Sequence, residues 1–144
     1  MKHVKISKKR GLLAALVVGL PLFAVPPSPA LAAGCYDSGC TGKNPSTMQC
    51  NDAWTTTSVQ PSGGGPAVEL RHSAQCNAVW ARSDSRWDFS IQGANSKGGP
   101  PVLSYTNGGG PYTLMIGFSY WVRACIRPAA YPQDQSTWTC TNWY

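Results

Sequence analysis

The sequence has little of what a catalytic site usually needs. Beyond the first 32 residues it holds a single histidine, His72, which is followed directly by Ser73. Neighbouring residues of an extended chain point to opposite faces, so these two side chains do not form a base and nucleophile pair. A G-x-S-x-G motif is also absent, and cysteines that we expect to be oxidised offer no thiolate nucleophile. We therefore expect no catalytic residue and a protein that is not an enzyme.

Metal ligands and paired carboxylates are equally scarce. No two cysteines have the C-x2-C spacing of a zinc site. Asp84 and Asp88 flank an expected turn, but the intervening Arg86 stands where a calcium loop needs an oxygen ligand. Glu69 shares a strand face with Arg71, which favours a surface ion pair over the two carboxylates of a glycosidase. We expect no metal and no cofactor.

Excess positive charge is missing from most of the chain. The formal net charge is +6, but five of the 12 lysine and arginine residues lie within residues 1–10. Residues 33–144 hold seven basic and six acidic side chains, a net charge of +1. We therefore expect no basic surface for nucleic acid or for an anionic membrane.

The basic N-terminus begins a predicted secretory signal peptide. Residues 1–10 precede an apolar run at 11–25, and A-L-A at 30–32 offers a small-residue cleavage site. The alternative, a membrane anchor, is disfavoured because the run is shorter than the ~20 residues of a spanning helix. We expect cleavage after Ala32 or one residue later. Residues 1–32 would then be the signal peptide, and residues 33–144 one secreted domain without a membrane span.

All six cysteines lie beyond the signal peptide. An even number in a short exported chain indicates three disulfides. Six cysteines allow 15 pairings, and the sequence does not choose among them. We favour Cys125 with Cys140, because the strand-like segments that contain them flank a proline-rich loop and could lie side by side. The other four would then pair among themselves, in one arrangement Cys35 with Cys40 and Cys50 with Cys76.

Apolar and polar residues alternate with the period of strands, and no segment beyond the signal peptide has a helical period. In the stretch 68–82, Val68, Leu70 and His72 share one face of a half-buried strand, and the second half is apolar on both faces, as in a central strand. Residues 34–51 are expected to be loop. Further strands are expected at 53–59, 87–92, 102–106, 112–116, 118–126 and 137–143.

The strand predictions define a fold class. The segments 102–106 and 112–116 flank an Asn-Gly sequence typical of a hairpin turn. Six or seven short strands, separated by Gly- and Pro-rich segments, predict an all-β fold. We expect a small antiparallel sandwich or barrel stapled by three disulfides.

A motif within residues 35–82 resembles a bacterial family. It reads C-x4-C-T-G-K-x-P, then C, then E-L-R-x-S-x-x-C-x-A-x-W-A-R, and is similar to the DUF2690 or YjfA-like family of secreted domains of unknown function. Glu69, Arg71 and Arg82 are charged residues of this motif, and His72 stands where the family would have a tyrosine. The resemblance implies a compact extracytoplasmic domain and brings no activity with it.

Aromatic residues are the richest functional signal. All six tryptophans and all six tyrosines lie beyond the signal peptide, and most should be buried because each removes a large apolar area from water. Trp143 and Tyr144 at the chain end, and Tyr112 beside a glycine loop, are candidates for an exposed surface that binds sugar rings or a partner protein. We expect a secreted non-catalytic binding or interaction domain that acts at the cell envelope or in the medium. Its partner would be a cell-wall polymer or a secreted protein.

Two other functions are weighed against this one. A small inhibitor of another secreted protein would need a rigid, disulfide-braced loop, for which Gly63–Pro66 or Gly98–Pro101 are the candidates. A secreted hydrolase is the third and less favoured interpretation.

Overall fold

The computed structural model describes residues 32–129 and 137–144. The expected signal peptide therefore lies outside the described residues, apart from Ala32. Within the described ranges, no helix is long and apolar enough to cross a membrane. The helical structure in these ranges is a 3-10 turn, η1, at Asp37–Cys40.

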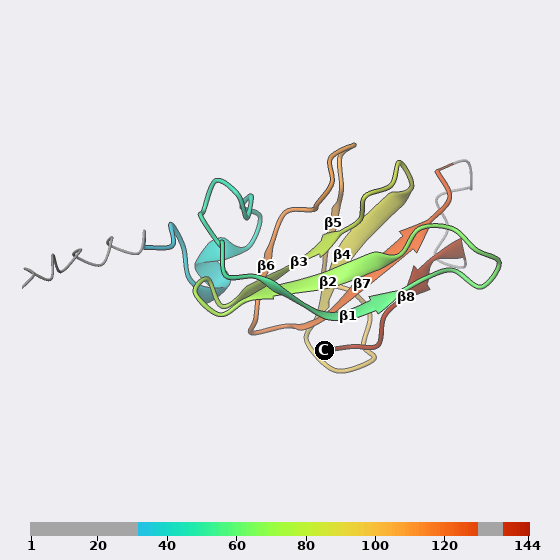
Figure 1. Ribbon diagram of the computed structural model, residues 1–144. Helices are drawn as coiled ribbons and strands as arrows, with labels where there is room; N and C mark the ends of the chain where they lie inside the picture. The colour runs from blue at the N-terminus through green and yellow to red at the C-terminus, as the bar shows by residue number, and fades with distance from the viewer. Residues whose placement is uncertain (1–31, 130–136) are drawn as a thin grey trace, which may run out of the picture.

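The described strands form two four-stranded antiparallel sheets (Figure 1). The first sheet has the order β1-β2-β3-β6, and the second has the order β5-β4-β7-β8. The bounds are β1 Trp54–Val59, β2 Val68–Ser73, β3 Ala78–Arg82, β4 Asp88–Ala94, β5 Leu103–Thr106, β6 Ile116–Gly117, β7 Trp121–Arg127 and β8 Thr139–Cys140. The all-β prediction is confirmed, and the two sheets with a shared core make the fold a sandwich.

Alternate residues of the longer strands fill the interior between the sheets. On β2 the side chains of Val68 and Leu70 are fully buried, as their alternation predicts. Strand β3 lies between β2 and β6, which confirms that the second half of this stretch is a central strand. The buried core residues are Val68, Leu70, Val79, Ala81, Phe89, Ile91, Ile116, Val122, Ala124 and Ile126.

A second, smaller cluster covers the other face of β3. The segment 34–51, which we expected to be loop, contributes to a group of buried side chains around Trp80 and Met115. It approaches β6 so closely that a Cβ atom on Gly117 would lie 2.5 Å from the carbonyl carbon of Asp37. Glycine is therefore needed at this position for the N-terminal segment to pack on the first sheet.

Three disulfides hold the fold together. They join Cys35 with Cys40, Cys50 with Cys76 and Cys125 with Cys140. The favoured Cys125–Cys140 pairing is confirmed, and the other four cysteines pair in the arrangement given as one possibility. Cys125 and Cys140 lie opposite each other on β7 and β8. The expected adjacency of the last two strands is therefore confirmed.

The expected hairpin around the Asn-Gly sequence is wrong. Strand β5 pairs with β4 in the second sheet, whereas β6 pairs with β3 in the first. The backbone N–H of Thr113 donates to Ala81 of β3, and that of Met115 donates to Lys43 of the N-terminal segment, so neither pairs with β5. The glycine loop is therefore a crossover between sheets.

Two further differences concern the second sheet. Ser90 and Gln92 of β4 are buried, although they alternate with the apolar Phe89 and Ile91 in the pattern of a half-buried strand. Strand β4 is central, and the Arg123 side chain donates to the Gln92 side-chain oxygen at 2.9 Å, so this face is covered.

The last strand is shorter than predicted, but the chain continues beside β7 after β8 ends. The backbone N–H of Thr141 donates to the Ala124 carbonyl. Tyr144 exchanges two backbone hydrogen bonds with Val122, at 2.8 and 3.0 Å. The chain end is therefore held at the beginning of β7.

Candidate functional site

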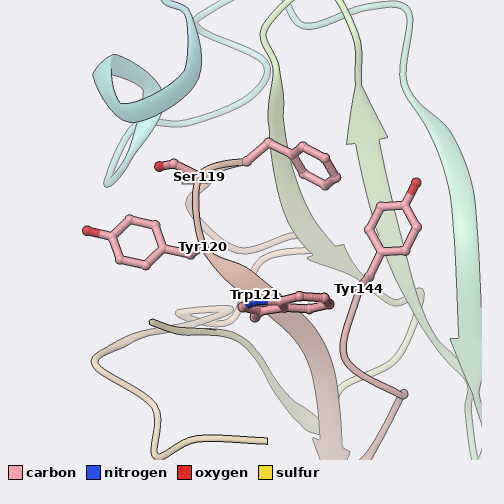
Figure 2. A pocket seen from close by; sticks show the side chains of 5 residues that line it. Ser119, Tyr120, Trp121 and Tyr144 are labelled. Atoms are coloured by element: carbon pink, nitrogen blue, oxygen red, sulfur yellow. The ribbon is translucent and has the colours of Figure 1, made fainter. Parts of the chain in front are cut away.

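Aromatic side chains surround a hollow at the beginning of β7. Its volume is about 190 Å³. Three of its residues lie in the turn that leads from β6 into β7, the next is the first residue of β7, and the fifth comes from the chain end. Figure 2 shows Trp121 and Tyr144 beside the same space, with Tyr120 directed away from Tyr144. We call this site the aromatic hollow; the residues that line it are Phe118, Ser119, Tyr120, Trp121 and Tyr144.

The aromatic hollow is open to solvent. Trp121 is 40% exposed and Tyr144 is 42% exposed. Trp54, which belongs to the same aromatic cluster, is 44% exposed. Grouped exposed apolar side chains mark surfaces that bind partners or ligands more often than isolated ones do.

His72 does not line the hollow, but it packs against two residues that do, Phe118 and Tyr144. Its ring stacks on Phe118 at a centroid distance of 4.6 Å, lies 4.7 Å from Trp54, and approaches Tyr144 edge-on at 6.2 Å. The residue is 9% exposed, and neither ring nitrogen has a hydrogen-bond partner in the described part of the chain. Burial lowers the pKa of His72, and the negative charge of Asp52 offsets this only in part. The neutral imidazole therefore acts as one more aromatic ring of the cluster.

Asp52 holds the turn between β2 and β3, which begins directly after the strand that carries His72. It accepts hydrogen bonds from the Ser73 hydroxyl and, at 2.8 Å, from the backbone N–H of Gln75. Burial raises the pKa of Asp52, but these hydrogen bonds outweigh that effect and bring the pKa below its ordinary value. The ionised carboxylate thus fixes the turn that follows His72.

The three aromatic residues predicted to form one surface lie in different surroundings. Tyr144 lines the aromatic hollow. Trp143 instead stacks on the guanidinium group of Arg123, 4.5 Å from its ring centroid. Tyr112 lines a separate hollow of about 230 Å³, together with Trp80. The structure therefore places only Tyr144 of the three in the aromatic hollow.

The charged motif residues connect the strands of the first sheet. Glu69 lies 3.6 Å from Arg71 and 4.0 Å from Arg82. Arg71 also donates to the Thr55 hydroxyl at 2.8 Å and to the Ala53 carbonyl at 2.6 Å. Both arginines border the separate hollow that Tyr112 lines. Because these groups satisfy one another across β1, β2 and β3, the motif has a clear structural role.

The acidic residues considered for hydrolysis or metal binding each contact an arginine. Asp84 lies 3.2 Å from Arg82, and Asp88 lies 3.4 Å from Arg127. The sulfur atoms of three cysteines approach within 4.8 Å of one another, but each belongs to a disulfide and offers no thiolate to a metal. These three are Cys35, Cys50 and Cys76.

Sequence reasoning missed most of the aromatic hollow. The sequence pattern places Phe118 and Trp121 in the strand expected at 118–126 and Trp54 in the strand expected at 53–59, without marking them as a surface. One signal was present: Tyr120 and Trp121 are consecutive, so on an extended chain they cannot both face the same core. A surface position for one of the two was therefore predictable, whereas the approach of Tyr144 was not.

The fold and the site define a class: a disulfide-bonded β-sandwich with an exposed aromatic hollow at the start of one strand. The family model described as "Protein of unknown function (DUF2690)" matches residues 38–125. This is more than half of the chain, and the protein belongs to this family, as the motif predicted. No curated protein and no solved structure matches the chain significantly. The family region includes Trp121 but ends before Trp143 and Tyr144.

Proposed function

We propose that the protein is a secreted, non-catalytic domain that binds a cell-wall polymer through the aromatic hollow. The observation that carries this proposal is the group of exposed rings around an open space, with Trp121 and Tyr144 on its walls. Flat aromatic faces provide apolar contact area at a low entropic cost, and the aliphatic faces of sugar rings fit such surfaces. A secreted protein is the alternative partner.

A non-catalytic role is supported by the state of the reactive side chains. His72 is enclosed by aromatic rings, and its neutral form is favoured by burial. Asp84 and Asp88 are paired with arginines and lie outside the aromatic hollow. Binding without a chemical step is therefore the activity that these surroundings favour over hydrolysis.

The inhibitor alternative receives no support from the disulfide pattern. Neither Gly63–Pro66 nor Gly98–Pro101 contains or adjoins a disulfide cysteine. A loop presented to another protein's active site would need bracing that these two lack.

Secretion is proposed from the N-terminal sequence and is compatible with the three disulfides. The intact mass of the exported protein should match a chain that begins at Ala33 or Gly34, less six hydrogens for three disulfides. A full-length mass in the membrane fraction would instead support the membrane anchor.

A sedimentation assay with isolated cell walls tests binding. We expect Trp121→Ala and Tyr144→Ala each to weaken binding about 5- to 10-fold, which corresponds to roughly 1 kcal/mol for one stacked ring. Tyr112→Ala is the matched control, because it removes an aromatic residue from the separate hollow. Loss of binding only in the control would move the site to that hollow, and failure of the wild type to bind walls would overturn the proposal.

A further inference from the structure

We infer that the bound polymer is a linear, anionic polysaccharide that extends from the aromatic hollow along the outer face of β7. This inference deepens the proposed function and rests on it. Three observations carry it. Buried and outward-facing residues alternate along β7, three tryptophans each lie beside a cation, and the positive charges of these pairs are not fully balanced by acidic side chains.

Strand β7 directs a row of polar and aromatic side chains away from the core. Val122, Ala124 and Ile126 belong to the buried core, so the intervening residues occupy the opposite face. Trp121, Arg123, Cys125 and Arg127 therefore lie on the opposite face, where Cys125 and Arg127 are buried. Trp121 is exposed and Arg123 is partly exposed, and Trp121 also lines the aromatic hollow. Arg123 and Arg127 are four residues apart, which spans about 13 Å along a strand.

A tryptophan lies beside each cation of this row. Lys97, from the loop between β4 and β5, lies 5.5 Å above the ring of Trp121. The chain that returns beside β7 places Trp143 at 4.5 Å from Arg123 and Trp138 at 4.4 Å from Arg127. We call these three pairs the tryptophan stripe; they are Lys97 with Trp121, Arg123 with Trp143, and Arg127 with Trp138.

The tryptophan stripe carries the excess positive charge of the described chain. Asp88 lies 3.4 Å from Arg127 and balances its charge, whereas Arg123 donates to an uncharged partner, Gln92. Lys97 is exposed and its side chain has no acidic partner in the described ranges. The other described side chains comprise four basic and four acidic residues, which cancel. The stripe thus carries the side-chain charge of +2 of the described ranges, and Asp134, which lies outside them, brings residues 33–144 to +1.

These features match one kind of occupant. The row of aromatic rings is longer than the hollow alone, so it suits a chain of sugar rings better than a single sugar. The unbalanced cations attract carboxylate or phosphate groups on that chain, and this attraction adds to ring stacking. Because Lys97 is a solvated surface charge, its contribution should decline as salt is added.

Three celluloses with the same backbone separate charge from stacking. Carboxymethyl cellulose and cellulose phosphate are anionic, hydroxyethyl cellulose is neutral, and polyglutamate provides charge without sugar rings. We expect the wild type to bind at least one anionic cellulose about tenfold more tightly than the neutral one and than polyglutamate. The better anionic probe identifies carboxylate or phosphate as the recognised group.

Two charge-reversal variants test the site of recognition. Lys97→Glu should weaken binding to the preferred anionic cellulose about tenfold at low salt and leave binding to hydroxyethyl cellulose unchanged. Lys43→Glu, an equal change at an exposed lysine of the N-terminal segment, should leave both unchanged. Equal loss of binding in the two variants would overturn the inference, because the net charge of the whole protein would then explain the preference for anionic cellulose.

Failure of this inference can be told apart from failure of the proposed function. If all three celluloses bind equally and Trp121→Ala weakens each of them, the aromatic hollow is a site for neutral sugar rings and the anionic inference is wrong. If Trp121→Ala has no effect on wall binding either, the proposed function is wrong as well. Preferential binding of polyglutamate would also overturn the inference, because charge alone would then be sufficient.

Discussion

Replacing His72 with phenylalanine should make the protein more stable at neutral pH. Both imidazole nitrogens are buried without a hydrogen-bond partner in the described part of the chain, while the ring stacks on Phe118 and packs at a tilt against Trp54. Burying unpaired polar groups costs about 1 to 3 kcal/mol in proteins. Phenylalanine keeps an aromatic ring in the cluster and removes this cost. We therefore expect His72→Phe to raise the free energy of unfolding by about 1 to 3 kcal/mol.

His72→Phe should also reduce the loss of folding stability that the protein shows as the pH falls. Burial lowers the pKa of His72 in the folded state below the ordinary value of 6.5. The unfolded chain therefore takes up a proton first, and the stability associated with neutral His72 is present above about pH 6.5 and is lost as pH falls. A single such group changes stability by at most about 1.4 kcal/mol per pH unit. The wild type should lose up to about 1.4 kcal/mol between about pH 7.5 and pH 5.5.

Urea denaturation of three proteins at these two pH values checks the reasoning. His72→Phe should show a smaller loss on acidification than the wild type. His72→Ala is the control for packing. It should also lose less stability on acidification, but it should be less stable than the wild type because the ring contacts with Phe118 and Trp54 are gone. The reasoning is refuted if the wild type is equally stable at both pH values and His72→Phe is less stable than the wild type at neutral pH.

Two further predictions concern the core and the disulfides. Trp80→Ala should lower the free energy of unfolding by roughly 3 to 5 kcal/mol, as loss of a buried large aromatic does. Trp143→Ala should lower it much less. Chemical denaturation of both variants measures these losses, and the reverse order would contradict the prediction. Replacing Cys125 and Cys140 together with alanine should cost about 3 kcal/mol, because the disulfide closes a loop with a sequence separation of 15. Calorimetry of this double variant should show one cooperative transition at a lower temperature, and an unchanged midpoint would mean that the bridge adds no stability.

Several features were predictable because they depend on local patterns. The alternation of Val68 and Leu70 with polar neighbours predicted a half-buried strand, and both side chains are buried as expected. The Cys125–Cys140 pairing followed from two strand-like segments joined by a short connection, and close sequence spacing makes such neighbours common in antiparallel sheets. The family motif was also visible directly in the sequence.

The errors arose where local patterns compete with distant partners. An Asn-Gly sequence favours a hairpin, but the segment that follows finds its hydrogen-bond partners on Ala81 of the first sheet and on Lys43 of the N-terminal segment. Ser90 and Gln92 are polar, yet β4 became central and the Arg123 side chain covers Gln92. In each case the decisive partner is far away in the chain, and no local period reports it.

The sequence by itself determined the class of fold, the strand-forming segments and the oxidised state expected of six cysteines, because these depend on residue type, period and count. Only the tertiary structure decided which aromatic residues stay exposed. Phe118, His72 and Tyr144 come from distant parts of the chain, and they meet because β2, the turn before β7 and the chain end are brought to one place. An aromatic residue becomes core or surface according to the segments that cover it, and that depends on how the sheets pack.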